Sequence, residues 1–515
     1  MELQSRLKAA HRPHASSRSL ELEDASGYTR DDRDLIRLGK KPVLKRNFGF
    51  MSILGFSCTV LVTWEGMLLT STQGLLNGGP AGIIYGFIVA WAGAMSTFLV
   101  LSELASMAPT AGGQYHWVFL LAPKSYRRFL SFITGWTTFA GWQALTASSA
   151  YLDSTLLQGV IVLANPSFHP KPWHTMLMYW AVLVFAVFIN TVASKTLAHF
   201  ESLILILHII GFFATLIPLV YLGPHADASI FTTFYNEGGW STQGLSFMVG
   251  LPAVAFSLLG SDSAIHMAEE IKDASTILPI SIIASILLNG SLGFAMAIAF
   301  VFCIGDLDAA IASQATLGYP FIYVFQQATQ STAGAVVISS IVFILGVCGC
   351  VGALASASRM LWSFARDKGV PQWQTLIKLD RRTSIPVYTI ALITFVSVLL
   401  SLIILGSSVA FNNIPYDPRA PVIDADNLHW GPWKVPGLVG VVNNALSLMY
   451  LLLMWFWSFW PPVTPVAPET MNFSVVTFSV VVTFGVVWYF LYGRKTYKGP
   501  IIEIELSTRH WEHLE

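Results

Sequence analysis

The residues best suited to chemistry lie in the stretch LGSDSAIHMAEEIK, residues 259–272, which ends an apolar segment. The stretch places the carboxyl of Asp262 inside a run that otherwise has the composition of a membrane span. An ionisable group in hydrocarbon is costly, so such a residue marks a ligand or ion site by default. The small residues Gly260 and Ser261 would let a helix break and present its backbone groups to a solute. The stretch therefore predicts a binding site within a membrane, as a protein that moves a solute requires.

We expect the helix to break over residues 256–262. The N–H groups at the start of its second half would carry partial positive charge and suit a carboxylate. The alternative for Asp262 is structural, as a cap that accepts N–H bonds from the second half. Glu269 and Glu270 follow and are expected at the membrane rim, either as part of a gate or as solvated charges.

A second candidate segment is SCTVLVTWEG, residues 57–66. Glu65 is the only carboxylate of its span, and beside Trp64 it could bind an ammonium group through charge and the ring face. The alternative is that Glu65 lies near the outer rim and is hydrated. Thr59, Val60 and Thr63 complete the predicted substrate-binding residues of this segment.

Other polar residues in apolar segments are expected to hold helices together. Gln143, Asp153 and His208 are interpreted first as partners in hydrogen bonds between helices, and second as cavity residues. Glu103 precedes the turn PTAGGQY, residues 109–115, whose glycines permit a tight turn. We expect Glu103 to bond across helices, with a possible part in coupling or gating.

Composition places these segments in a membrane protein. Apolar residues make up 54% of the chain and charged residues 11%, and the mean hydropathy is +0.60. A soluble domain has roughly 25% charged residues. The net charge of +0 gives no sign of nucleic acid as a partner. The four cysteines all lie in apolar runs, so the sequence supports neither a disulfide framework nor a metal site.

A spanning helix needs about 20 mostly apolar residues. Eleven segments qualify, at residues 48–70, 83–101, 129–163, 176–192, 203–222, 245–265, 280–303, 336–362, 387–405, 438–459 and 475–491. Lys and Arg gather in alternate connections, which places the amino terminus in the cytosol. We therefore divide the chain into a disordered cytosolic tail (1–46), a transmembrane domain (47–495) and a second cytosolic tail (496–515).

The alternation fails after the ninth segment. Two further spans would leave the carboxyl terminus outside, although Arg494, Lys495 and Lys498 follow the last span directly. One additional span between residues 413 and 416 would remove the contradiction. The other possibility is that residues 387–405 do not cross as an ordinary span.

Four motifs in order give the chain its resemblance to a known family: DRDLIRLGKKPVLKRNF (32–48), SELASMAPTAGGQY (102–115), the 262–270 stretch, and ASRMLWSFARDKGVP (357–371). The chain resembles the amino acid–polyamine–organocation (APC) superfamily, and within it the fungal amino acid/choline transporters that include GABA permease-like proteins. The resemblance covers residues 31 to about 500.

That resemblance implies an all-α polytopic membrane protein with a 5+5 inverted-repeat, LeuT-like fold. It also implies substrate binding between breaks in the first and sixth helices, an aromatic gate at Phe256 and proton coupling near Asp262. Relatives have a Gly-Ser-Gly break in the first helix where this chain has Thr59, Val60 and Leu61. They also have twelve spans, and here the tenth is missing between Ile414 and Pro415, with a splicing or gene-model artefact as the leading explanation.

The predicted function is secondary active transport of amino acids or related amines such as GABA or choline, coupled to protons. No nucleotide-binding glycine loop occurs in a polar segment, so ATP is not the expected energy source. A non-transporting nutrient sensor and a transporter of a specialised amine-containing metabolite are the alternatives. We expect no enzymatic activity and no cofactor. The expected location is the plasma membrane, or alternatively the vacuolar membrane.

Overall fold

The computed structural model describes residues 29–402, 430–468 and 470–501, and every regular element in these ranges is helical. Among the described residues, nine helices are long and apolar enough to cross a membrane. They are Phe50–Leu76, Gly79–Met107, Arg127–Ala164, Pro172–Thr191, Ser194–Leu222, Ala274–Phe302, Thr332–Arg366, Gly437–Trp457 and Ser474–Thr496. Two shorter apolar helices, Gln243–Phe256 and Val387–Ser401, correspond to the remaining two predicted segments. The prediction of an all-helical membrane protein is confirmed.

The structure divides into two compact units, and the large one comprises residues 43–501. In the described part of the small unit, α2 (Arg30–Arg37) begins with a capping box. Thr29 N donates to Asp32 Oδ2 at 3.1 Å, and Asp32 N donates to Thr29 Oγ1 at 3.3 Å. The structure thus differs from the expectation of a tail without structure, because reciprocal capping satisfies the first N–H groups of a helix. The rest of this expectation, at residues 1–28 and 502–515, lies outside the described residues.

The first and sixth predicted spans of the large unit are each interrupted. The first consists of α3 (Phe50–Leu61) and α4 (Thr63–Leu76), separated by Val62 at φ +38°. A β-branched residue is strained in the left-handed region. The sixth consists of α10 (Gln243–Phe256) and α11 (Ser263–His266), with Gly260 at φ +108° between them. The predicted break over residues 256–262 is confirmed, and the first helix breaks directly after the residues that the resemblance indicated.

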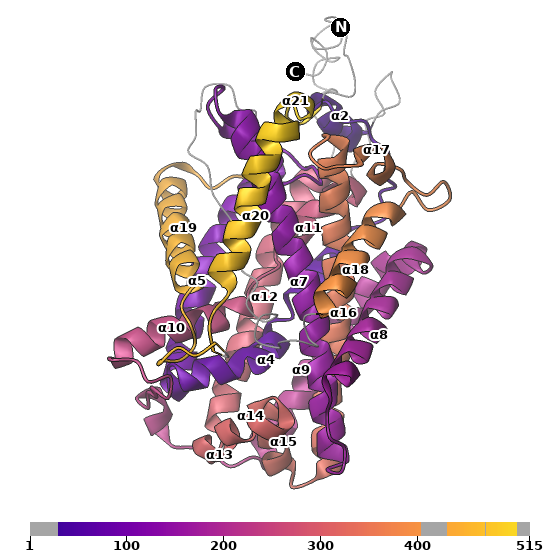
Figure 1. Ribbon diagram of the computed structural model, residues 1–515. Helices are drawn as coiled ribbons and strands as arrows, with labels where there is room; N and C mark the ends of the chain where they lie inside the picture. The colour runs from indigo at the N-terminus through magenta and orange to yellow at the C-terminus, as the bar shows by residue number, and fades with distance from the viewer. Residues whose placement is uncertain (1–28, 403–429, 469, 502–515) are drawn as a thin grey trace, which may run out of the picture. The chain divides into compact units, whose positions relative to one another are not determined.

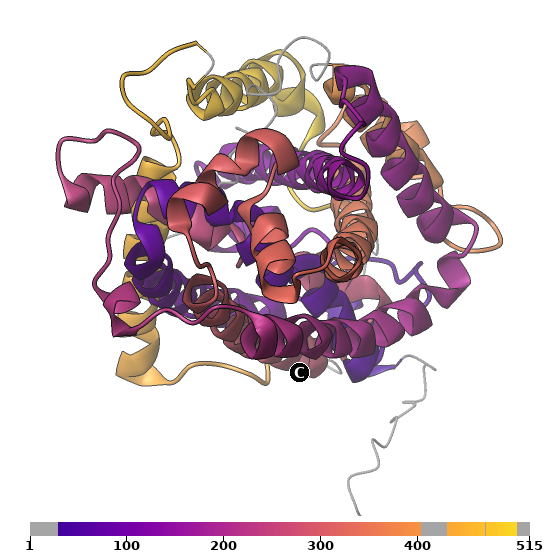
Figure 2. The same cartoon turned by 90° about the horizontal axis from the view of Figure 1, so that it is seen from below.

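The large unit has two ends that differ in their elements. At one end lie α13 (Leu307–Ala312), α14 (Gln314–Leu317) and α15 (Pro320–Thr329), at the bottom of Figure 1. Seen from this side in Figure 2, the salmon-coloured helices of this region lie across the bundle. At the opposite end lie α17 (Trp373–Leu376) and α21 (Arg494–Thr496), at the top of Figure 1. We call these the α15 end and the α17 end.

The long helices between the two ends pack in neighbouring pairs. The elements that matter for the site are α5 (Gly79–Met107), α7 (Arg127–Ala164), α8 (Pro172–Thr191), α9 (Leu197–Leu222), α12 (Ala274–Phe302) and α16 (Thr332–Arg366). The closest associations are α16 with α7, α12 with α5 and α3 with α9. The last of these joins one half of the broken first helix to an unbroken span.

The helices α18 (Val387–Ser401) and α19 (Gly437–Trp457) both begin at the α17 end. For α19 the position is fixed by its preceding segment, in which Trp433 N donates to Ser106 Oγ and Val435 N to Glu103 Oε1, both at 3.1 Å. Successive spans of a membrane protein begin at opposite ends. Because α18 and α19 begin at the same end, their direction agrees with a missing span between them. The predicted site of the missing helix, between Ile414 and Pro415, lies outside the described residues.

Candidate functional site

The two helix breaks meet. A Cβ atom added at Gly260 would lie 3.1 Å from Val60 Cγ1 and 3.3 Å from the Val60 carbonyl oxygen. A side chain at Gly260 would be tight against Val60, and the backbone φ of +108° also suits glycine. The fold therefore brings together Val60 and Gly260, which the sequence placed in separate segments.

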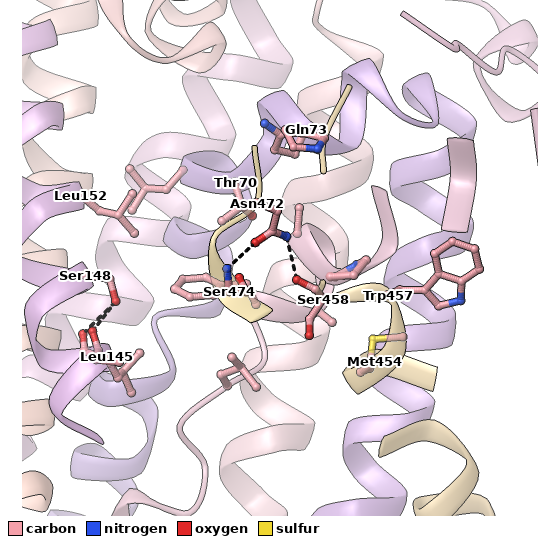
Figure 3. A pocket seen from close by; sticks show the side chains of 18 of the residues that line it. Thr70, Gln73, Leu145, Ser148, Leu152, Met454, Trp457, Ser458, Asn472 and Ser474 are labelled. Atoms are coloured by element: carbon pink, nitrogen blue, oxygen red, sulfur yellow. Dashed lines mark hydrogen bonds between the residues drawn. The ribbon is translucent and has the colours of Figure 1, made fainter. Parts of the chain in front are cut away.

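A cavity of about 550 Å³ lies beside the sixth-helix break, within the range of small-molecule sites. Its wall comes from α4, α7, α10, the break, α19 and the residues after α19. Figure 3 shows part of this wall, in which Asn472 bonds to the Ser458 carbonyl and to Ser474 N. Aromatic side chains are frequent in the wall: Tyr151, Phe256, Tyr319, Tyr450, Trp455, Trp457 and Trp460.

Asp262 is the single acidic or basic residue among the described residues that line this cavity. Only 1% of its surface is exposed, and Gln114 Nε2 donates a hydrogen bond of 2.8 Å to its Oδ2. His266 lies one turn further on, bonded through Nδ1 to the Ala111 carbonyl at 2.9 Å. The PTAGGQY turn therefore holds Asp262 directly through Gln114 and holds His266 through Ala111.

Close packing explains why glycine occurs in that turn. Gly113 has φ +50°, and a Cβ atom there would lie 2.8 Å from Ile265 Cγ2. A side chain at Gly113 would push α11 away from the turn. This shift would disturb the hydrogen bond between Gln114 of the turn and Asp262.

The predicted first-helix residues lie elsewhere. Among them Thr59, Val60, Thr63, Trp64 and Glu65 are buried and do not line this cavity. The first helix contributes later residues instead, including Thr70 and Gln73. Phe256, Gly260 and Asp262 of the sixth helix do line it, whereas Ser261 is fully buried without a hydrogen-bond partner for its hydroxyl.

Glu65 pairs with a histidine. His208 Nδ1 of α9 lies 2.8 Å from Glu65 Oε1, and the two side chains are 1% and 0% exposed. Glu65 is therefore not at a hydrated rim in this structure. Trp64 packs against His208 with ring centroids 6.0 Å apart. The interpretation of His208 as a partner between helices is confirmed.

Gln143 and Asp153 also lie between helices. Gln143 Nε2 donates to Ser397 Oγ of α18 at 2.8 Å, which confirms its predicted role. Asp153 faces Gly346 of α16 so closely that a Cβ atom at Gly346 would overlap its carboxyl. No partner is present among the described residues for Asp153 Oδ2.

The α17 end is closed by two buried ion pairs. Arg366 Nη1 lies 2.7 Å from Glu269 Oε2, and Arg359 Nε lies 2.9 Å from Glu270 Oε1. All four side chains are at most 10% exposed. Glu269 and Glu270 are thus not solvated charges here, since each is bound to α16. This arrangement is compatible with a gate, and their gating role remains a prediction.

The segment after α21 joins the same network. Tyr115 Oη donates to Asp367 Oδ2 at 2.8 Å, and Ile501 N donates to Asp367 Oδ1 at 2.8 Å. The Tyr497 hydroxyl lies 2.6 Å from Ser131 Oγ. Asp367 therefore links the PTAGGQY turn, α16 and the end of the described chain. Glu103 holds the segment before α19, as described above, and its predicted coupling role is untested.

The sequence reasoning missed Gln114, Arg359 and Arg366 as partners of predicted acids. Gln114 and Arg359 each lie within a quoted motif, but their partners are 148 and 89 residues away. The available signal was that Arg359 and Arg366 both lie at the end of a span. Buried arginines need acidic partners, so nearby acids could have been expected to pair with them.

These features define a multi-pass membrane transporter, with interrupted helices around a solute-sized cavity. Comparison with known proteins agrees. Residues 48–416 match the family described as Amino acid permease. The chain belongs to this family, whose members are permeases and not enzymes, and it is a transporter of amino acids or related substrates.

Individual relatives cover most of the chain. A choline transporter of Saccharomyces cerevisiae is 31% identical over 472 residues, which are 88% of this chain and 83% of the relative. Amino-acid permease 2 of Neurospora crassa is 27% identical over 513 residues, with 96% and 94% covered. A putative amino acid/polyamine transporter of Macrophomina phaseolina is 27% identical over 441 residues, with 82% and 96% covered.

Proposed function

We propose that this permease is a secondary carrier for a small solute with a cationic amine head, such as choline, GABA or an amino acid. The observation that carries the proposal is the cavity wall, in which Asp262 is the single acidic or basic residue among the described lining residues and aromatic side chains are frequent. An acid in such a wall attracts a cation, and the aromatic rings favour an ammonium group through their negative faces. The similarity to a choline transporter supports the same class of solute.

The carrier is driven by protons and works by alternating access. The Lys and Arg bias of the connections assigns the α17 end to the cytosol, so the cavity of this conformation would receive solute from outside. Glu269 and Glu270 keep the cytosolic side shut until their pairs with α16 separate. The plasma membrane is the proposed location.

Uptake of labelled choline, GABA and amino acids into a host without its own permeases tests the proposal. Asp262→Asn removes the charge and keeps the shape, so we expect uptake of the transported amine to fall by at least about tenfold, the equivalent of 1.4 kcal/mol of lost binding. The control is Glu237→Gln, an exposed acid outside the cavity wall.

A chain with about 20 apolar residues inserted after Ile414 is measured in parallel, because that length restores one span. Uptake by the extended chain alone would show that transport needs the missing crossing. Absence of amine uptake by both chains, or full uptake by the Asp262→Asn variant, would contradict the proposal.

A further inference from the structure

One buried acid has no place in the site described above. Glu201 lies in the second turn of α9, and its side chain is 0% exposed. Neither carboxyl oxygen has a hydrogen-bond partner among the described residues. Its lack of partners sets it apart from Glu65, Glu269 and Glu270, which are all paired.

Glu201 lies in the seam between α9 and α3. A Cβ atom at Gly55 of α3 would overlap the Glu201 carbonyl oxygen, so the two backbones touch there. Thr59 lies beside the carboxyl, and its hydroxyl donates to the Gly55 carbonyl at 2.8 Å. In this geometry the one hydrogen of the hydroxyl is engaged by Gly55, and a protonated carboxyl of Glu201 could donate to the hydroxyl oxygen. Rotation of the hydroxyl toward Glu201 would break the bond to Gly55.

Among the described residues Glu201 has no hydrogen-bond or ion-pair partner. Cys348 of α16 lies within electrostatic range of Glu201, of Asp153 on α7 and of Glu65 on α4. On α9 itself, His208 is engaged by Glu65. A buried carboxylate without a cation or N–H donor costs several kcal/mol and instead takes up a proton. The burial and the missing hydrogen bonds of the carboxyl therefore favour the neutral form of Glu201.

The seam is mechanically linked to the gate. Phe48 lies just before α3 and makes two backbone hydrogen bonds. Phe48 N donates to the Glu270 carbonyl at 3.1 Å, and Lys272 N donates to the Phe48 carbonyl at 3.0 Å. The other end of α3 is the strained Val62. Breaking the Glu269 and Glu270 pairs would release α3 to pivot at Val62, and movement away from α9 would admit water to Glu201.

We propose that Glu201 is the proton-binding residue of the transport cycle, protonated while the α17 end is closed and ionised when the α3–α9 seam opens. The proton enters with the solute and leaves to water on the cytosolic side, so each proton bound is also released and no other reactant is needed. This inference rests on the proposed function for its role in flux. The protonation of Glu201 itself can be measured without flux.

The first experiment is infrared difference spectroscopy of the purified full chain at pH 7, comparing the wild type with Glu201→Gln. Glutamine matches the neutral acid in shape and should preserve the fold. We expect the variant to lose a carbonyl band of a protonated carboxyl, whereas Glu237→Gln, which alters an exposed acid, should lose only carboxylate bands. An unchanged protonated-carboxyl band in Glu201→Gln overturns the inference, even for a chain that carries no solute.

The second experiment is accumulation of choline in proteoliposomes with an imposed pH gradient. One coupled proton gives about tenfold accumulation per pH unit. We expect Glu201→Gln to lose this dependence while exchange of choline across the membrane at equal pH continues, and Glu237→Gln to retain both. Gradient-driven accumulation in Glu201→Gln equal to that of the wild type overturns the inference. If the wild type shows no exchange of choline, that result contradicts the proposed function instead. The infrared result then decides whether Glu201 is protonated.

Discussion

The cavity and the α17 end hold their acidic groups in opposite ways. Among the described residues the cavity wall contains one acid, Asp262, which accepts a hydrogen bond from the neutral side chain of Gln114. At the α17 end, Glu269 and Glu270 are neutralised by arginines of α16. The comparison teaches that an acid held by a neutral side chain is placed where a solute could reach it, and that acids paired with arginines are placed where the protein must be shut.

The pairs at the α17 end suit a latch. A buried ion pair adds little net stability, because desolvation offsets the attraction, but removal of one partner is costly. An arrangement in which one partner is lost is therefore much less stable than the closed arrangement with both pairs formed. The hydrogen bond from the neutral Gln114 to Asp262 allows a different exchange, in which a solute can replace part of the acid's surroundings.

The largest effect is expected from breaking one pair. Arg359→Ala would leave Glu270 buried without its cation, at a cost of about 3–5 kcal/mol. Thermal unfolding in detergent measures the change, with Lys378→Ala at an exposed position of the same end as the control. Equal unfolding temperatures for the two variants would show that the Arg359–Glu270 pair does not hold this end.

A smaller effect is expected from packing. Gly55→Ala would overlap the α9 backbone, and overpacking costs about 1–3 kcal/mol. Gly244→Ala at the start of α10 meets nothing within 4 Å and should be neutral or stabilise by up to about 1 kcal/mol through helix propensity. The same unfolding measurement separates them, and a tolerated Gly55→Ala would mean that α3 and α9 can separate at little cost.

The smallest effect concerns exposed turns. Hydrogen bonds from Thr383 and Arg382 hold the pKa of Asp380 below its usual value, and hydrogen bonds from Ser229 do so for Asp227, between α9 and α10. A lowered pKa means that the turn is stabilised at neutral pH and loses this contribution as the pH falls through the lowered value.

Asp380→Asn should therefore loosen residues 381–385 more than Asp227→Asn loosens residues 228–231. Asp380 accepts bonds of 2.7, 2.8 and 3.0 Å, whereas Asp227 accepts a backbone bond of 2.9 Å. Amide hydrogen exchange at pH 7, corrected for intrinsic rates, measures the difference. Equal protection in both turns would remove this distinction between them.

Much of the site could be predicted from local pattern. The cost of an acid in an apolar run identified Asp262, and the small residues beside it located the sixth-helix break. The same reasoning predicted that Glu65 either binds a solute or lies at a hydrated rim. It could not identify His208 as the partner, because the two residues are 143 positions apart and meet only when α4 packs on α9.

The sequence by itself determined the class of this protein. Its apolar segments are long enough to span a bilayer, charged residues are few, and Lys and Arg gather in alternate connections. Only the tertiary structure decided which buried acids are paired, which one lines the cavity, and that Glu201 has no hydrogen-bond partner among the described residues. The physical reason is range. Burial and helix breaks follow from neighbouring residues, whereas the state of an ionisable side chain depends on groups that distant helices bring within hydrogen-bond distance.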